Sequence, residues 1–158
     1  MSRQSKQELL NAISDQFRIS QNWSDAFDEI ASEILGINRT DMRVIDIVER
    51  RGRATAGEVA KEAALTTGGV TAVVDRLEKL GYLKRVRDPD DRRRVWVEPT
   101  PELWERAGKI WAPLSDRWES RARNLSRDQL EFILSFLAEG NEMMAGEIER
   151  VRAMRDRT

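Results

Sequence analysis

The sequence predicts a mainly α-helical fold of the α+β class, with its longest helical segments at the two ends of the chain. Apolar residues recur at steps of three or four along most of the 158 positions, which is the spacing of amphipathic helices. Residues 83–98 depart from this spacing and place β-branched residues on either side of a charged turn, as a β-hairpin does. With 40% hydrophobic residues, the chain can bury the core of one domain.

The N-terminal third of the chain contains two predicted helices. Residues 7–35 form one long helix or two nearly continuous ones, and Gly36 is a natural C-terminal stop. Residues 40–51 form a shorter amphipathic helix that ends at Gly52. The apolar positions that define these helices are Leu10, Ile13, Phe17, Trp23, Phe27, Ile30 and Ile34 in the first, and Val44, Ile45 and Val48 in the second.

Two helices joined by a tight turn follow in the middle of the chain. Thr55 and Glu58 have the spacing of a capping box, which predicts that the first of these helices starts at Thr55. The second spans residues 67–80, and Gly81 ends it. Its apolar face consists of Val70, Val73, Val74, Leu77 and Leu80. This order of elements is the outline of a helix-turn-helix.

A β-hairpin is predicted directly after this pair of helices. Its strands are residues 83–87 and 93–98, and Asp88 with Pro89 suits the first two positions of a type I turn. Residues 84–94 carry six Lys or Arg against three Asp, although the formal net charge of the whole chain is −1. Positive charge is therefore concentrated in the hairpin.

Two further helices complete the predicted chain. Thr100 and Pro101 suit the N-cap and the first position of a helix that runs to about residue 122. Ser126 and Gln129 form another capping-box pattern, which begins the last helix. The apolar positions of these two helices are Trp104, Trp111, Trp118, Leu130, Ile133, Leu134, Leu137, Met144, Ile148 and Val151.

The composition argues against several classes of function. The chain has no Cys and no His, so it lacks thiol nucleophiles, imidazole bases and the usual ligands of transition metals. We therefore expect no catalytic residues, no metal and no cofactor, and we do not expect an enzyme. No stretch has the length and apolarity of a signal peptide or a membrane helix, so we expect a cytoplasmic protein without a membrane partner.

A helix-turn-helix followed by a basic hairpin is the arrangement of a winged helix. The second helix of the motif can enter a major groove, and the hairpin, or wing, can follow the backbone or reach a minor groove. A narrow minor groove has strong negative potential and favours an arginine at the tip of such a turn. The sequence thus predicts a winged helix-turn-helix domain that contacts double-stranded DNA.

Two stretches resemble the MarR family of bacterial winged-helix regulators. They are 66-TTGGVTAVVDRLEKLGYLKR-85 and 88-DPDDRRRVWVEPT-100, in which Asp91, Arg93 and Thr100 match the wing pattern of that family. The resemblance implies a sequence-specific regulator of transcription, a repressor that a small molecule releases from a pseudo-palindromic operator. It also implies three regions: an N-terminal dimerisation helix in 1–39, the winged domain in 40–99, and C-terminal dimerisation helices in 100–158.

The resemblance also implies which residues contact DNA. Arg93 aligns with the arginine that enters the minor groove, and Asp91 with the carboxylate that orients it. The recognition helix, about 66–80, begins at the TTGG stretch, and the wing spans about 83–98. Arg76 either reaches a phosphate or pairs with a nearby acid. The DNA-binding residues we predict are Thr55, Thr66, Thr67, Gly68, Gly69, Thr71, Ala72, Arg76, Arg92, Arg93 and Arg94.

A homodimer and an effector are further implications of the resemblance. The apolar stripes of the terminal helices would interlock with a second copy of the chain. A small aromatic or anionic effector could bind a pocket formed by Trp23, Phe27, Arg43, Trp104 and Trp111. The alternative for the tryptophans is that they belong to a helix-packing core, and Arg43 could simply pair with an acid.

A second class of function stays open at this point. Many members of the resembling family carry an arginine where this chain has Ala72, and an arginine is the most direct reader of guanine. Together with the net charge of −1, this departure allows a winged-helix protein-interaction module without specific base reading.

Overall fold

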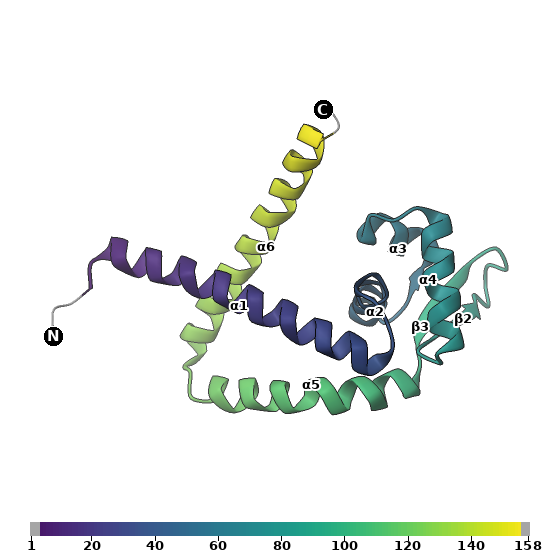
Figure 1. The fold of residues 1–158 in the computed structure, drawn as a ribbon, viewed down its shortest axis with the longest axis horizontal. Helices are drawn as coiled ribbons and strands as arrows, with labels where there is room; N and C mark the ends of the chain where they lie inside the picture. The colour runs from purple at the N-terminus through teal and green to yellow at the C-terminus, as the bar shows by residue number, and fades with distance from the viewer. Residues whose placement is uncertain (1–3, 156–158) are drawn as a thin grey trace. The chain divides into compact units, whose positions relative to one another are not determined.

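The computed structural model describes residues 4–155 as helices joined by a small antiparallel sheet (Figure 1). The first three residues of the predicted 1–39 region and the last three of the 100–158 region lie outside this range. The elements in chain order are α1 (Lys6–Leu35), α2 (Arg39–Arg51), β1 (Ala54–Thr55), α3 (Ala56–Ala63), α4 (Thr67–Lys79), β2 (Leu83–Arg87), β3 (Val95–Pro99), α5 (Pro101–Ala122) and α6 (Arg127–Arg155).

The chain divides into two compact units within α5. The first comprises Met1–Ile110 and contains the helix-turn-helix and the sheet; the second comprises Trp111–Thr158 and contains the end of α5 and all of α6. This division describes packing within a single chain, whereas the three regions expected from the sequence are functional and stay a prediction. Within the described part of the chain, no helix is long and apolar enough to cross a membrane.

Side-chain caps fix the starts of most helices. The predicted capping box of Thr55 and Glu58 is present, and Thr55 is the N-cap of α3. Ser126 and Gln129 also bond reciprocally before α6. Gly36 has a φ of 68°, a left-handed conformation that glycine adopts without strain, and it ends α1 as predicted. The local sequence signals therefore placed these helix ends correctly.

The sheet has the strand order β1-β3-β2, with both pairs antiparallel. The second strand of the hairpin begins at Val95, two residues later than predicted. Residues 93 and 94 instead belong to a turn, because the amide of Arg94 donates to the carbonyl of Asp91 at 2.9 Å. The two-residue strand β1 was not predicted, and it makes β3 the central strand.

The core lies where α2, α3, α4 and the sheet meet. The fully buried side chains there include Val44, Val48, Val59, Val70, Val74, Leu77 and Val97. The apolar face predicted for the recognition helix is buried at Val70, Val73, Val74 and Leu77, but Leu80 is 37% exposed. Leu80 differs because it is the C-cap, past the last turn of α4.

Tyr82 joins three segments of the first unit. Its side chain is fully buried, and its hydroxyl donates to the carbonyl of Leu35 at the end of α1, at 2.9 Å. Arg106 of α5 lies over the ring, with its guanidinium carbon 5.7 Å from the ring centroid. Thr100 donates its amide to the carbonyl of Tyr82, at 3.0 Å. The end of α1, the end of the recognition helix and the start of α5 are thus tied to one residue.

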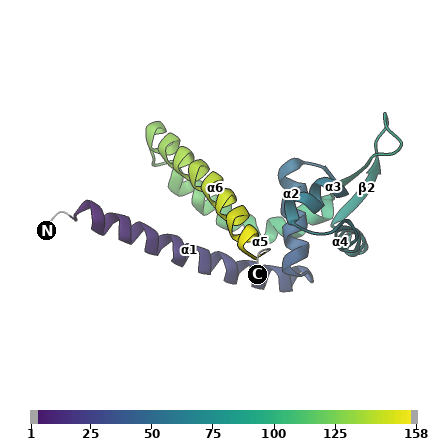
Figure 2. The ribbon, with the colours of Figure 1, turned by 90° about the horizontal axis from the view of Figure 1, so that it is seen from above.

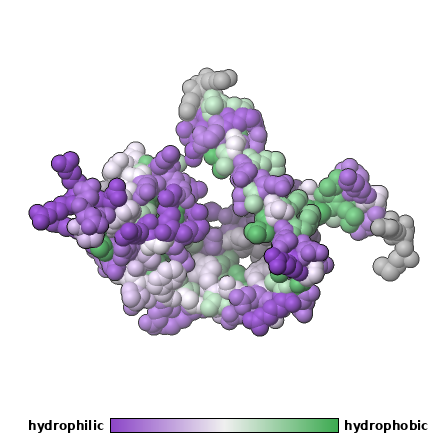
Figure 3. Space-filling model, turned by 180° about the vertical axis from the view of Figure 1, so that it is seen from behind, coloured by the Kyte–Doolittle hydropathy of each residue, from purple (hydrophilic) through white to green (hydrophobic). Residues whose placement is uncertain are grey.

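The long helices leave much of their apolar surface exposed. Figure 3 shows hydrophobic surface, in green, along α1 and along α6. None of the described side chains of α6 is buried. Large apolar side chains that are at least 46% exposed include Leu10, Ile13, Phe17, Trp23, Ile30 and Ile34 on α1, and Phe132, Leu134, Leu137, Met144, Ile148 and Val151 on α6. Surfaces of this kind mark interaction sites in soluble proteins.

Tyr82→Phe should lower the free energy of unfolding by about 1–2 kcal/mol, because the buried carbonyl of Leu35 loses its donor. Urea denaturation at one fixed protein concentration measures this change. A loss well below about 0.5 kcal/mol would mean that the hydroxyl contributes little and that packing of the ring alone holds the junction.

Candidate nucleic-acid interface

The exposed N-terminal half of α4 is the first part of the candidate interface. Thr66 caps the helix, and its Oγ1 accepts the amide of Gly69 at 3.1 Å. The first turn of α4 has no acidic residue, whereas the first turns of the other five helices carry Glu8, Asp41, Glu58, Glu102 and Asp128. The amide groups of this helix end therefore have no neighbouring carboxylate to compete with a phosphate.

The threonines predicted to contact DNA differ in their present partners. Thr71 donates its hydroxyl to the carbonyl of Thr67 at 3.0 Å, and Thr55 donates to Glu58 at 2.8 Å as part of its capping box. Within residues 4–155 the hydroxyl of Thr67 has no partner. Thr66, Thr67, Thr71 and Ala72 are exposed, and Thr55 is half-buried.

The two glycines of this turn have different surroundings. A Cβ on Gly69 would lie 3.2 Å from Oγ1 of Thr66, so glycine at that position makes room for the cap. A Cβ on Gly68 would have no heavy atom within 4 Å. Nothing within the described chain therefore requires glycine at 68, and the bare backbone there leaves room for the close approach of a ligand.

Arg76 pairs with an acid, which is one of the two roles expected from the sequence. Its guanidinium binds both carboxylate oxygens of Asp41, with Nε 3.0 Å from Oδ2. Asp41 is fully buried, and the Arg76 side chain is 44% exposed. The hydrogen bond that Arg76 donates to the Asp41 carboxylate raises the pKa of Arg76. The pair holds the recognition helix against the start of α2, and it engages the guanidinium that the other expected role would direct to a phosphate.

The acids of the recognition helix are neutralised by a residue of the sheet. Arg85 on β2 binds Asp75 at 2.7 Å and also pairs with Glu78. Its amide donates to Glu78 at 2.8 Å. Asp75 and Glu78 would otherwise repel a phosphate backbone close to α4, so Arg85 reduces the negative charge of this part of the helix.

The loop that joins β2 and β3 projects away from the sheet and the short helices (Figure 2). The amides of Asp90 and Asp91 donate to Oδ1 of Asp88 at 2.9 and 3.1 Å. The Asp88 side chain thus closes the start of the loop, where the sequence predicted a turn. Asp88 is also bonded through its other oxygen, which accepts the indole N–H of Trp96 at 2.7 Å.

Asp91 supports Arg93 in a different way from that expected. Oδ1 of Asp91 accepts the backbone amide of Arg93 at 3.0 Å, while the guanidinium of Arg93 has no partner within residues 4–155. The carboxylate therefore fixes the backbone at the turn and leaves the cation extended. The reason is geometric, because a short Asx turn directs the aspartate to an amide two residues ahead.

The arginines of the wing fall into two groups. The guanidinium groups of Arg87, Arg92 and Arg93 make no hydrogen bond or ion pair within the described chain, and all three residues are exposed. Arg94 lies over Trp96, 5.3 Å from its ring centroid, and Arg53 lies over the same ring at 4.5 Å. Arg87, Arg92 and Arg93 are thus available for a phosphate or a groove.

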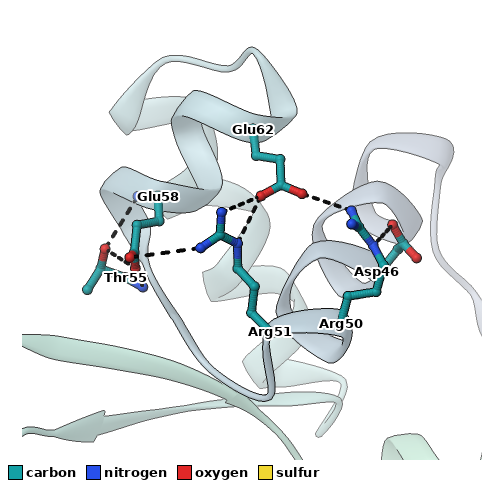
Figure 4. Close-up of polar contacts among 6 residues, drawn as sticks. All are labelled: Asp46, Arg50, Arg51, Thr55, Glu58 and Glu62. Carbon is teal, nitrogen blue, oxygen red and sulfur yellow. Dashed lines mark hydrogen bonds and ion pairs between the residues drawn. The ribbon is translucent and has the colours of Figure 1, made fainter. Parts of the chain in front are cut away.

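A polar network connects α2 to α3 (Figure 4). Arg51 binds Glu62 at 2.8 Å and approaches Glu58 at 4.0 Å, while Arg50 binds Glu62 at 2.8 Å and Asp46 at 3.0 Å. The hydrogen bond from Arg51 lowers the pKa of Glu62. Arg50 and Arg51 are engaged within the protein, so neither is a free cation for DNA.

Two of the residues predicted for an effector pocket are exposed in the first unit. Trp23 is 73% exposed and Trp104 is 49% exposed. Arg43 donates to the carbonyl of Ala63 at 3.5 Å, rather than to an acid. Trp111 is the first residue of the second unit. Among the described residues, no cluster of three or more acids has the arrangement of a metal site.

Sequence reasoning missed three residues of this interface. Trp96, Arg53 and Arg85 organise the wing and the recognition helix, but none of them was predicted to do so. Strand alternation could have found Trp96, since Val97 points into the core and Trp96 must face the other side. Arg53 and Arg85 gave no local signal, because their partners lie in other elements.

Comparison with known proteins supports this arrangement. Residues 35–94 match the sequence model of the MarR family. An uncharacterized HTH-type transcriptional regulator of Bacillus subtilis (strain 168), YcgE, is 37% identical over 150 residues, which cover 95% of this chain and 97% of YcgE.

Solved structures share the fold. NadR in complex with 4-hydroxyphenylacetate has a TM-score of 0.58 at 24% identity, covering 88% of this chain and 96% of NadR. The F27L mutant of S. aureus MepR bound to an oligodeoxyribonucleotide has a TM-score of 0.56 at 19% identity, covering 84% and 97%. At these identities the likeness concerns the fold alone.

Gly68→Ala should raise the free energy of unfolding by about 0.5 kcal/mol, because alanine restricts the unfolded chain and its Cβ meets nothing. The same variant should weaken DNA binding, since the added methyl group blocks close approach of DNA to the backbone. Urea denaturation and fluorescence anisotropy measure the two effects. Gly69→Ala is the matched control, because it disturbs the Thr66 cap even without DNA. Unchanged affinity in Gly68→Ala would leave Gly68 as a tolerated first-turn glycine.

Proposed function

The chain belongs to the MarR family and is a DNA-binding regulator of transcription, and from this premise we propose that α4 and the wing together form its DNA contacts. The observation that carries the proposal is the distribution of unpaired cations. Arg87, Arg92 and Arg93 extend from the wing with no side-chain partner in the described chain, while the acids of α4 are held by Arg85. This pattern favours binding to a polyanion.

We assign the two elements different tasks. The exposed first turns of α4, at Thr66, Thr67, Gly68, Thr71 and Ala72, enter the major groove. Ala72 can contact a thymine methyl group but cannot form the bidentate contact that reads guanine. Arg93 enters the adjacent minor groove, and Arg92 contacts phosphates. The operator should therefore contain an A·T-rich segment under each wing.

We further propose that the chain acts as a homodimer. The exposed apolar residues of α1 and α6 require cover, and a second copy would supply a matching surface. Two recognition helices related by a twofold axis would bind a pseudo-palindrome with half-sites one helical turn apart. Sedimentation equilibrium tests this directly, and the mass of a single chain at micromolar concentration would contradict it.

Repression relieved by a small molecule is the regulatory mode that we propose. The structure of NadR contains 4-hydroxyphenylacetate, a small aromatic anion, which supports an effector of that chemistry. In this proposal a dimer would complete a pocket around Trp23, Phe27, Arg43 and Trp104. A thermal-shift screen of aromatic carboxylates, followed by DNA titration with each hit, tests both ligand binding and release.

Selection from a pool of random duplexes tests the proposed DNA contacts and does not require the operator sequence to be known. The selected duplex should bind with a strong dependence on salt. Failure to enrich any sequence over a scrambled duplex would contradict specific base reading, and it would favour the alternative of a winged-helix protein-interaction module.

Arg93→Ala should weaken binding to the selected duplex by about tenfold and lower the salt slope by about one, with an unchanged melting temperature. The reason is that its guanidinium has no partner within the described protein. Anisotropy titrations at several salt concentrations measure both quantities. Unchanged affinity would remove the wing from the proposed interface.

Arg76→Ala is the contrasting variant. It leaves the buried carboxylate of Asp41 without its cation, so it should lower the free energy of unfolding by about 2 kcal/mol. The salt slope of the residual DNA binding should not change. A slope lowered by about one, with unchanged stability, would instead assign Arg76 to a phosphate.

A further inference from the structure

Trp96 lies at the base of the wing and connects it to the rest of the first unit. It is half-buried on β3, where the register pairs it with Val86 of β2 and with Thr55 of β1. Arg53, directly before β1, and Arg94, directly before β3, both lie over its ring. The indole is therefore contacted by one residue that precedes the helix-turn-helix in the chain and by one that follows it.

A chain of hydrogen bonds runs from this indole to the tip of the wing. The Nε1–H group of Trp96 donates to Oδ2 of Asp88, at 2.7 Å. Oδ1 of Asp88 accepts the amide of Asp91, at 3.1 Å, and Oδ1 of Asp91 accepts the amide of Arg93, at 3.0 Å. The backbone of Arg93 is thus positioned relative to the sheet through two carboxylates in series.

We propose that the Trp96–Asp88 pair positions the wing for DNA, so that the 88–94 loop is ordered before binding and Arg93 is presented in one geometry. The inference rests on the proposed contact between the wing and DNA. Ordering a loop on binding costs conformational entropy and so weakens affinity. A loop that is already ordered in the free protein avoids this loss when DNA binds. Trp96 and Asp88 are positioning residues, since they act through the backbone of Arg93.

The charge of Asp88 makes the proposal distinguishable from simple electrostatics. A carboxylate in a wing that approaches phosphates should repel them, and its removal should strengthen binding. Asp90 has such a carboxylate two residues away, and its side chain has no partner within residues 4–155. Asp88 differs because its carboxylate holds the indole. The hydrogen bond from Trp96 is the largest cause that lowers the pKa of Asp88, and the bonds from the amides of Asp90 and Asp91 lower it further. The two aspartates should therefore respond to neutralisation in opposite directions.

The experiment compares Asp88→Asn, Asp90→Asn and Trp96→Phe with the unaltered chain on the selected duplex. Asparagine at 88 can still accept the two amides through its oxygen, but its NH2 group cannot accept the indole N–H. Asp88→Asn and Trp96→Phe should each weaken binding by about tenfold. Asp90→Asn should bind as well as the unaltered chain or better. The double variant Asp88→Asn/Trp96→Phe should be no weaker than the weaker single variant, because both remove the same bond.

Two further measurements separate positioning from loss of folding. The preference for A·T over G·C under the wing should fall in Asp88→Asn and Trp96→Phe while the melting temperature changes little. The indole N–H signal of Trp96, assigned by its absence from the spectrum of Trp96→Phe, should exchange with solvent faster in Asp88→Asn than in Asp90→Asn. Both results would support the proposal.

Three outcomes would overturn it. Equal effects of Asp88→Asn and Asp90→Asn on affinity would reduce the role of Asp88 to its charge. If Trp96→Phe binds the selected duplex with unchanged affinity and unchanged A·T preference, the indole does not position the wing. If the unaltered chain enriches no duplex, the proposed function fails and the positioning role fails with it, whereas in the first two cases the unaltered chain still binds DNA and the proposed function stands.

Discussion

The position of the recognition helix depends on the buried carboxylate of Asp41. One of its oxygens accepts the amide of Asn38 and so caps α2, and both oxygens bind Arg76 of α4. A buried carboxylate without a cation is costly, so the pair strongly favours one placement of α4 against α2. The buried apolar faces of α2 and α4, which include Val44 and Val74, then pack in that one placement. The outward face of α4 is set by the same pair.

The ion pairs of individual residues say more about the binding partner of this protein than its net charge does. A net charge of −1 argues against a polyanionic partner when it is considered alone. In the structure, most acids near the helix-turn-helix are engaged by arginines, as Glu62 is by Arg50 and Arg51. Arg87, Arg92 and Arg93 of the wing have no side-chain partner within the described chain. A local group of unpaired cations therefore coexists with a net charge of −1, because the acids near the helix-turn-helix are largely paired.

Much of the fold could be predicted because its signals are local. The capping box of Thr55 and Glu58 and the apolar spacing of the recognition helix each lie within a few residues, and both were placed correctly. The contact of Arg76 with Asp41 joins residues 35 positions apart, and no short pattern indicates it. Strand β1 is too short to carry a periodicity. The family resemblance identified Asp91 and Arg93 as a pair. It could not predict that Asp91 binds the backbone amide of Arg93 and not its guanidinium, because that choice depends on the geometry of the turn.

The pairing of β1 with β3 has a consequence for how the chain folds. Ala54 lies opposite Val97, so this contact closes a loop that contains α3, α4 and β2. The hairpin of β2 and β3 can form early, because its strands are close in sequence, whereas the β1 contact must wait until both helices have packed. The shortest strand of the protein is thus a late-forming element, and local opening of the winged part should begin with its release from β3.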